Sequence, residues 1–149
     1  MGGGEAEGAW AERLRAFLKR VEARMGHVEG FILFGSMAKG QAGEWSDVDV
    51  LVVSDFFKDM PVPERIGLLL EEAEPRIEPF GYTYDELVRM VRRANPLALG
   101  ALVEGIFIKA SGRLRKLASE ASRAFVRRRR VWIPREQLRE GGKSSSGEV

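Results

Sequence analysis

A Gly-Ser pair and an Asp-x-Asp triplet, each joined to a short apolar run, constrain this chain more than any other feature. Val28–Phe34 runs into Gly35-Ser36, and ten residues later Asp47-Val48-Asp49 opens a run that ends at Val53. Short runs of branched and aromatic residues, bounded by glycine and polar residues, are typical of buried strands. The pattern therefore predicts two central strands, with a polar turn after the first and two acids at the start of the second.

The two acids predict a site for a divalent metal. Asp47 and Asp49 are two residues apart, so on a strand their side chains leave the same face, with Cα atoms roughly 6.5–7 Å apart. Two carboxylates with no basic neighbour in sequence repel each other unless a cation lies between them. Oxygen ligands favour Mg²⁺ or Mn²⁺ over zinc, and Mg²⁺ completes its shell with water and substrate phosphates. The alternative is that both acids are merely solvated residues at a strand start.

The Gly-Ser pair predicts a phosphate-binding turn beside this metal. Gly35 lets the backbone turn closely against a phosphate, and Ser36 offers a hydroxyl and an N–H at the start of a predicted helix, where the exposed amides and the dipole favour an anion. Lys39, about one turn further on, adds a positive charge for the same phosphates. Ser46, directly before the acids, is a further candidate to orient Asp47 or contact a phosphate oxygen.

Glu78 is the candidate for a third acid, both as a catalytic residue and as a metal ligand with Asp47 and Asp49. Its predicted strand, 75–80, could lie beside the strand that carries the two aspartates. There Glu78 would share a metal and accept the proton of an attacking hydroxyl. The expected reaction is in-line attack on the α-phosphorus of a nucleoside triphosphate, with pyrophosphate leaving.

The remaining pattern predicts one α/β (α+β) domain, a small mixed β-sheet flanked by helices. Periodicity and caps predict helices over 10–26, 64–74, 83–91, 97–104 and 111–130, and strands over 28–34, 48–53, 75–80 and 106–110. Thr83 and Glu86 form a predicted capping box, and Ser111 caps a long basic C-terminal helix. We assign residues 1–8 to a disordered N-terminus, 9–139 to the domain (core about 10–110, basic helix about 111–130) and 140–149 to a flexible tail.

Composition excludes several other classes. The chain has 149 residues, 44% of them hydrophobic, which suits one globular domain. It has no cysteine and a single histidine, so disulfide frameworks and thiolate or histidine-rich metal sites are excluded. No secretory signal and no apolar run of the roughly 20 residues that a membrane span needs can be found. We therefore expect a cytoplasmic protein with no membrane association.

Charge is distributed unevenly along the chain. Residues 1–108 carry 12 basic and 18 acidic side chains, whereas residues 109–149 carry 12 basic and 4 acidic ones. Arg127, Arg128, Arg129 and Arg130 are the centre of the basic part. They are interpreted either as a solvated helix end or as a contact for RNA, DNA or an acidic partner. Trp132 and Ile133 follow at once, and if exposed they predict docking onto a partner chain or a second copy in a homo-oligomer.

At the Gly-Ser pair and the Asp-x-Asp triplet, the chain resembles the minimal nucleotidyltransferases of the DNA polymerase β-like superfamily. Their signature of Gly-Ser, ten residues and Asp-x-Asp is present as Gly35-Ser36 and Asp47-Val48-Asp49, and the resemblance covers about residues 10–110. It implies a nucleotidyltransferase fold, ATP or another nucleotide as donor, Mg²⁺ and transfer of a nucleotidyl group. Glu78 lies where the family more often has Asp. Family members also often act beside a HEPN-domain protein, as the antitoxin of a toxin–antitoxin pair that modifies the toxin with AMP.

Three functions are compatible with these patterns. The leading hypothesis is an ATP- and Mg²⁺-dependent nucleotidyltransferase acting on a hydroxyl of a protein or nucleic acid. The second is a catalytically weak or inactive nucleotide-binding subunit that acts by binding a partner protein. The third is a nucleic-acid-binding module led by the arginine run.

Overall fold

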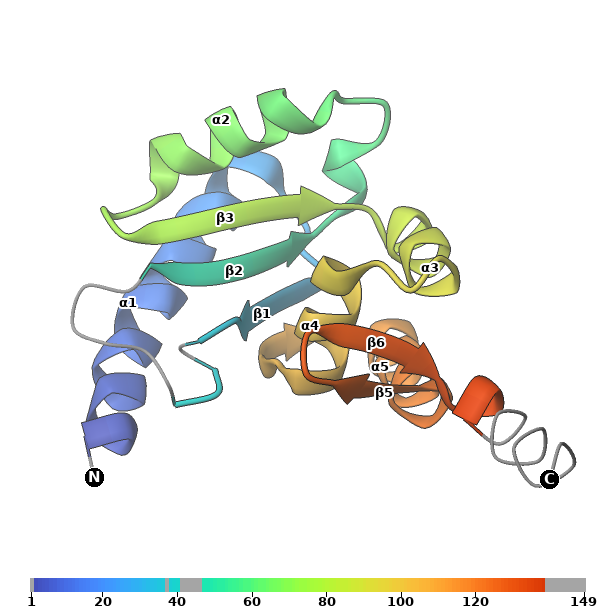
Figure 1. Ribbon diagram of the computed structural model, residues 1–149. Coiled ribbons are helices and arrows are strands. Elements are labelled where there is room, and N and C mark those ends of the chain that lie inside the picture. The colour runs from blue at the N-terminus through green and yellow to red at the C-terminus, as the bar shows by residue number, and fades with distance from the viewer. Residues whose placement is uncertain (1, 37, 41–46, 139–149) are drawn as a thin grey trace, which may run out of the picture.

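The computed structural model describes residues 2–36, 38–40 and 47–138, with side chains described from Trp10 onward (Figure 1). Its centre is a four-stranded mixed sheet in the order β3-β2-β1-β4. The strands are β1 (Gly30–Phe34), β2 (Val48–Val53), β3 (Ile77–Tyr82) and β4 (Ile106–Ala110). β1 is antiparallel to β2 and β4, and β2 is parallel to β3. The predicted mixed sheet flanked by helices is therefore confirmed.

Helices cover both faces of this sheet (Figure 1). One face packs against α1 (Gly2–Met25), the short 3₁₀ helix η1 (Asp55–Phe57) and α2 (Val62–Glu72). The other packs against α3 (Tyr84–Arg92), α4 (Pro96–Glu104) and α5 (Gly112–Ala124). Alternate residues of β2 face the two layers: Val48, Val50 and Val52 face α1, whereas Leu51 and Val53 face the layer of α3, α4 and α5. This double burial explains why β2 is almost wholly apolar.

Local signals place several element ends as predicted. Thr83 and Glu86 make the reciprocal bonds of a capping box at the start of α3. Asn95 caps α4 through the backbone N–H groups of Leu97 and Ala98, and Ser111 caps α5. Other bounds shift: β3 lies two residues later than predicted. α1 begins at Gly2, within the Gly-rich segment that composition predicts to be disordered.

The predicted basic helix over 111–130 is wrong beyond residue 124. α5 ends at Ala124, and the chain then forms an antiparallel hairpin of β5 (Phe125–Arg128) and β6 (Val131–Pro134). Aromatic and branched residues flank the arginine run on both sides and favour strands, and Arg129 adopts a left-handed φ of 59° in the connecting turn. The run therefore lies in a hairpin and its turn, not at a helix end.

Trp132 and Ile133 do not form the exposed apolar contact that would predict docking onto a partner. Trp132 is 7% exposed and packs with the core formed by α3, α4 and α5, while Ile133 is half-buried. The hairpin thus closes over this core by turning its aromatic residues inward.

Among the described residues, no helix is long and apolar enough to cross a membrane. The proposed tail, 140–149, lies outside the residues that the structure describes.

Candidate active site

One edge of the sheet gathers the segments that the sequence motif predicts to act together. Because β1 and β2 are antiparallel, the end of β1 meets the start of β2, and Phe34 lies opposite Asp49. Because β2 and β3 are parallel, the start of β3 reaches the same edge, and Asp49 lies in register with Glu78. The Gly35-Ser36 turn and the three acids therefore share one edge, which we call the acid edge (Asp47, Asp49 and Glu78).

Asp49 and Glu78 are in direct contact. Both follow the alternation that places Leu51 and Phe80 on the face of α3, α4 and α5, so their side chains leave the same face. Burial of Asp49, a hydrogen bond with Glu78 and repulsion by Glu78 and Asp47 raise its pKa from 3.8 to about 6. Phe34 and Phe80, whose ring centroids are 5.7 Å apart, provide the apolar surroundings. The predicted pairing of the Glu78 strand with the aspartate strand is confirmed.

Asp47 and Glu78 are exposed, whereas Asp49 is half-buried. Within the described part of the chain, no three His, Cys, Asp or Glu side chains converge closely enough to hold a metal ion. The chemistry of the edge nevertheless suits a cation: carboxylate oxygens are hard ligands, and the mutual repulsion that raises the pKa of Asp49 is relieved by a positive charge. The three acids as a ligand set remain a prediction.

Gly35 fits the carboxylate of Asp49 closely. Its φ is +77°, which L side chains rarely adopt, and a Cβ at this position would collide with Oδ2 of Asp49. Glycine is therefore required twice, for the backbone conformation and for the space that the carboxylate occupies. This contact couples the predicted phosphate turn directly to Asp49, one of the predicted metal ligands.

The segment after Gly35 is a turn, so the predicted helix start is wrong. The described residues 35, 36 and 38–40 form turns, with a single helix-type bond from the Lys39 N–H to the Gly35 carbonyl at 3.3 Å. Gly40 also has a positive φ, of 69°, so a helix could not continue through it. Ser36 is exposed and can still offer its hydroxyl, but no helix dipole supports it. Ser46 lies outside the described residues.

Lys39 points to a partner that sequence reasoning missed. Its Nζ lies 3.3 Å from Oε1 of Glu104, the last residue of α4. The same carboxylate accepts bonds from Arg127 Nε at 3.0 and 3.1 Å and lies 2.9 Å from Arg127 Nη2. Glu104 therefore joins the Gly35–Gly40 turn to the C-terminal hairpin. The only local signal was an acid at a helix C-terminus, where the dipole disfavours a negative charge unless cations neutralise it.

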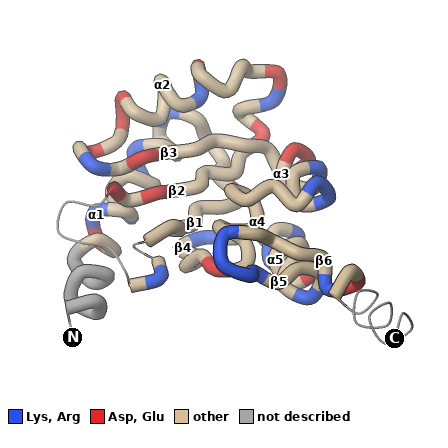
Figure 2. Tube along the Cα trace, viewed as in Figure 1, with Lys and Arg blue, Asp and Glu red and all other residues tan. Residues whose placement is uncertain are grey.

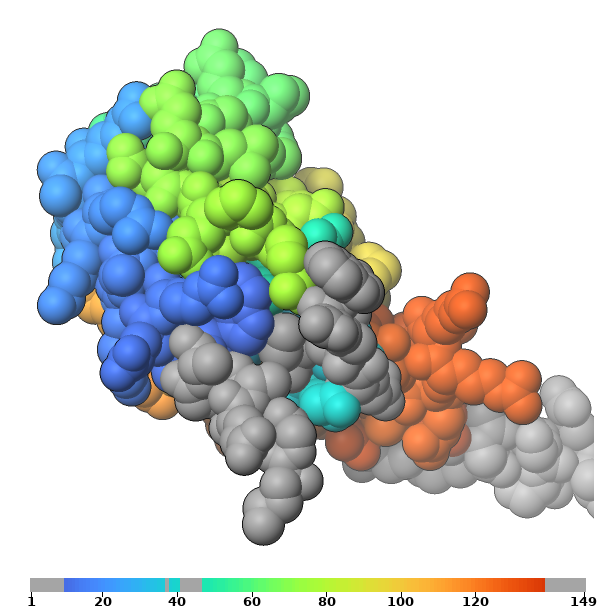
Figure 3. Space-filling view, turned by 90° about the vertical axis from the view of Figure 1, so that its left-hand side faces the viewer, coloured from blue at the N-terminus to red at the C-terminus, as the bar shows by residue number. Residues whose placement is uncertain are grey.

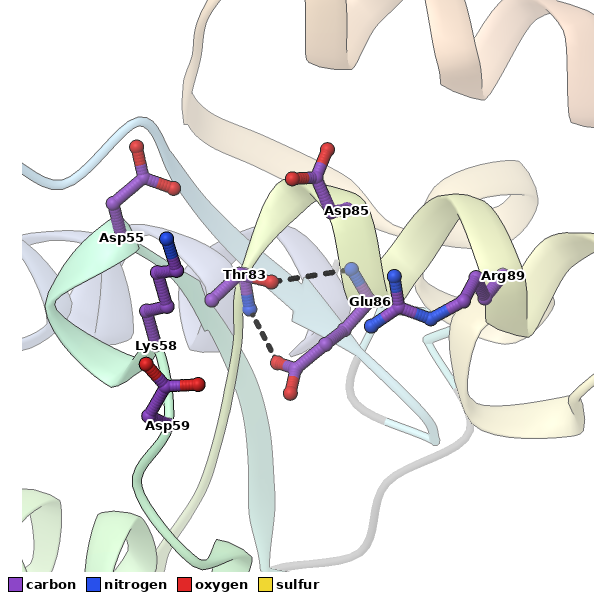
Figure 4. Close-up of a pocket in the computed structure, with 7 residues that line it drawn as sticks. All are labelled: Asp55, Lys58, Asp59, Thr83, Asp85, Glu86 and Arg89. Atoms are coloured by element: carbon purple, nitrogen blue, oxygen red, sulfur yellow. Dashed lines mark hydrogen bonds between the residues drawn. The ribbon is translucent and has the colours of Figure 1, made fainter.

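A separate cavity of about 340 Å³ lies at the opposite ends of the same strands (Figure 4). Asp55, Lys58 and Asp59, which follow β2, line one side of it. Thr83, Asp85, Glu86 and Arg89, at the start of α3, line the other. The capping-box bonds of Thr83 and Glu86 cross its wall. Because the acid edge is formed by the starts of β2 and β3, this cavity is not the site that the motif predicts.

The structure thus brings the Gly-Ser turn and carboxylates of two neighbouring strands to one sheet edge, as the sequence motif predicts. Residues 14–139 match the family model of the nucleotidyltransferase domain, so the chain belongs to that family and is a transferase. The resemblance to the polymerase β-like nucleotidyltransferases is thereby confirmed.

A solved structure supports the fold. A proposed nucleotidyltransferase from Sulfolobus solfataricus is similar with a TM-score of 0.56 at 18% sequence identity, over 72% of this chain and 86% of that chain. A comparison with curated proteins found no match.

Proposed function

We propose that this chain transfers a nucleoside monophosphate, AMP from ATP, to a hydroxyl of a macromolecular acceptor in the presence of Mg²⁺ or Mn²⁺. The observation that supports it best is the acid edge, where Asp49 is held against Gly35 on one side and Glu78 on the other. These acids have like charges, and burial together with their mutual repulsion raises the pKa of Asp49 to about 6. A cation carrying a triphosphate is the ligand that such an edge favours.

Each residue has a distinct task in this proposal. Asp47 and Asp49, with Glu78, hold the metal, which supplies charge neutralisation for the phosphates. The Gly35-Ser36 turn receives the phosphate groups through its backbone N–H and the Ser36 hydroxyl, and Lys39 adds a positive charge from beside Glu104. Ser46 is proposed to orient Asp47.

The reaction is an in-line substitution at the α-phosphorus. The acceptor oxygen forms a bond to the α-phosphorus while the bond to the bridging oxygen of the β-phosphate breaks, and pyrophosphate leaves with that electron pair. Glu78 accepts the hydroxyl proton, because it is the exposed member of the Asp49–Glu78 pair and can reach an incoming acceptor.

The test is transfer of label from α-labelled ATP to acceptor mixtures of protein and nucleic acid, with Mg²⁺ or Mn²⁺. Asp47→Ala and Asp49→Ala are expected to abolish labelling. Asp85→Asn, which changes an exposed acid of the separate cavity, is the matched control and should retain it. Labelling that survives both alanine substitutions would contradict the mechanism.

A partner of the HEPN type is proposed on the family resemblance, with this chain acting as the antitoxin that modifies it. The competing function is a catalytically weak or inactive subunit that binds such a partner without transfer. Co-expression with a small α-helical neighbouring gene product separates the two. AMP added to the partner, and lost in Asp49→Ala, supports catalysis; copurification that Asp49→Ala leaves unchanged, without added AMP, supports the binding subunit.

A further inference from the structure

The arginine run divides into one internal residue and three outward ones. Arg127 pairs with Glu104 and stacks over the Trp132 ring at 4.9 Å, so it holds the hairpin onto α4. Arg128, Arg129 and Arg130 are exposed. Among the residues that the structure describes, none of these three has an ion-pair partner. The turn therefore presents three consecutive cations that no described acid neutralises.

This turn is connected to the acid edge through Glu104. Glu104 binds Lys39 of the Gly35–Gly40 turn and Arg127 of β5, which lies one residue pair from the hairpin turn, and Gly35 contacts Asp49. In Figure 2 the basic turn between β5 and β6 is the end of the hairpin that lies nearer to the acidic starts of β2 and β3. In Figure 3, which faces that side, the orange hairpin and the cyan residues of the Gly35–Gly40 turn lie on one visible face.

The surface of the hairpin offers charge without an apolar anchor. Trp132 and Phe125 are 7% and 9% exposed, and Val131, at 59%, is the one large apolar side chain exposed on the hairpin. Protein interfaces are usually built around a buried apolar core with few charges, whereas phosphate backbones are bound by exposed arginine and lysine. Three adjacent guanidinium groups next to one valine fit a phosphate backbone better than a protein surface.

We infer that the β5–β6 hairpin is a docking site for single-stranded nucleic acid, which it holds through backbone phosphates so that a terminal hydroxyl reaches the acid edge. Its role as an acceptor site rests on the proposed function, whereas the binding itself does not. Arg128, Arg129 and Arg130 contact successive phosphates, and the bond of Glu104 to Arg127 and Lys39 sets the distance between hairpin and site. Base identity is not read by these contacts, because guanidinium–phosphate pairs carry no sequence information.

The experiment is fluorescence anisotropy of labelled single-stranded RNA and DNA oligonucleotides with the full chain, without nucleotide or metal. Three phosphate contacts on a single strand predict a slope of log affinity against log salt of about −2 between roughly 50 and 200 mM salt. Arg128→Gln/Arg130→Gln is expected to weaken binding and to reduce that slope by about 1.4. Arg92→Gln/Arg93→Gln, which removes two exposed cations at the end of α3, is the matched control and should leave both unchanged.

Arg129→Gly protects the test against misfolding. Glycine adopts a φ of 59° without strain, so this variant should keep the turn and the melting temperature while losing one phosphate contact. Its salt slope should fall by about 0.7.

The outcomes separate the alternatives. Binding that is unchanged in both hairpin variants overturns the inference, as does a hairpin that binds acidic peptide or free ATP but no oligonucleotide. Binding that the hairpin variants weaken, with no nucleotidyl transfer under any condition, supports the docking site and counts against the proposed function. Transfer to an RNA or DNA end whose KM rises in the hairpin variants while kcat is kept supports both.

Discussion

Carboxylates at the two ends of β2 and β3 have pKa values shifted in opposite directions. At the cavity end, burial alone would raise the pKa of Glu86, but hydrogen bonds and the charge of Arg65, with the backbone N–H of Thr83, bring that pKa below its ordinary value. At the acid edge, burial, Glu78 and Asp47 all raise the pKa of Asp49. Glu86 at one end is thus neutralised by Arg65, whereas no basic group among the described residues lowers the pKa of Asp49 at the other.

A buried arginine neutralises Glu86 at the cavity end. Arg65 is 3% exposed and donates to both oxygens of Glu86, at 2.6 and 2.9 Å, and to the carbonyls of Met60 and Gly81. Glu29, near the same end, is held likewise by Ser111 and Arg113, whose hydrogen bonds lower its pKa. Glu86 and Glu29 thus each have an arginine partner within the fold, whereas none of the described basic groups lowers the pKa of Asp49.

The largest expected loss of stability comes from removing Arg65, which neutralises Glu86 at the cavity end. Arg65→Met should destabilise the protein by about 3 kcal/mol, because it leaves Glu86 and two carbonyls without their donor. Urea unfolding measures the change. Arg89→Met, an exposed arginine of the same cavity, is the control and should stay within about 0.5 kcal/mol of the wild type. Equal losses in both variants would refute a special role for Arg65.

The next effect concerns the contact of the turn with the acid edge. Gly35→Ala should cost about 2 kcal/mol and should also abolish most transfer, because it combines a disfavoured φ with displacement of the Asp49 carboxylate. Gly40→Ala has a similar φ of +69° but open space around the new Cβ, so it isolates the backbone cost. If both variants lose the same stability and activity, the contact with Asp49 is irrelevant.

A divalent cation bound at the acid edge should neutralise its carboxylates, as Arg65 neutralises Glu86 at the other end, and should therefore stabilise the fold. Mn²⁺ at about ten times its dissociation constant should raise the free energy of unfolding by about 1.4 kcal/mol. Asp47→Asn/Asp49→Asn should remove this stabilisation, and a chelator should reverse it in the wild type. Thermal unfolding with and without Mn²⁺ provides the measurement. Stabilisation that persists in the double variant would place the metal elsewhere.

The smallest expected effect is a pH dependence of stability that comes from Asp49. The pKa of Asp49 is higher in the folded state than its ordinary 3.8, so its protonated form stabilises the fold below about pH 4, and this stability is lost as pH rises through about 6. Asp49→Asn removes that dependence. The metal-free variant should therefore be more stable than the wild type at about pH 7.5, by about 1 kcal/mol after allowance for solvent screening.

Unfolding of both forms at about pH 7.5 and pH 4 measures this difference, which should shrink at the lower pH. The same substitution should abolish transfer, so stability and activity change in opposite directions. A variant that is less stable at about pH 7.5 would show that Asp49 carries a structural bond after all.

Local patterns were sufficient for much of the molecule. Strand β2, strand β4 and the caps at Thr83 and Ser111 lie where the sequence predicts them, because alternation and side-chain-to-backbone bonds act over a few residues. The Gly-Ser and Asp-x-Asp spacing likewise predicted which segments meet. The helix prediction failed after residue 124, because it extended a basic, helix-compatible run into aromatic and branched residues that form a hairpin at 125–134.

The sequence by itself determined the acids, the glycine beside them and the strands that bring them to one edge. Tertiary structure alone decided that Glu104 binds both Lys39 and Arg127, which are 65 and 23 residues away from it. It also decided that Trp132 points inward while Arg128–Arg130 are exposed, without an ion-pair partner in the described part of the chain. Short-range rules cannot supply such facts, because the partner of a charge and the dielectric around it depend on which surfaces pack together.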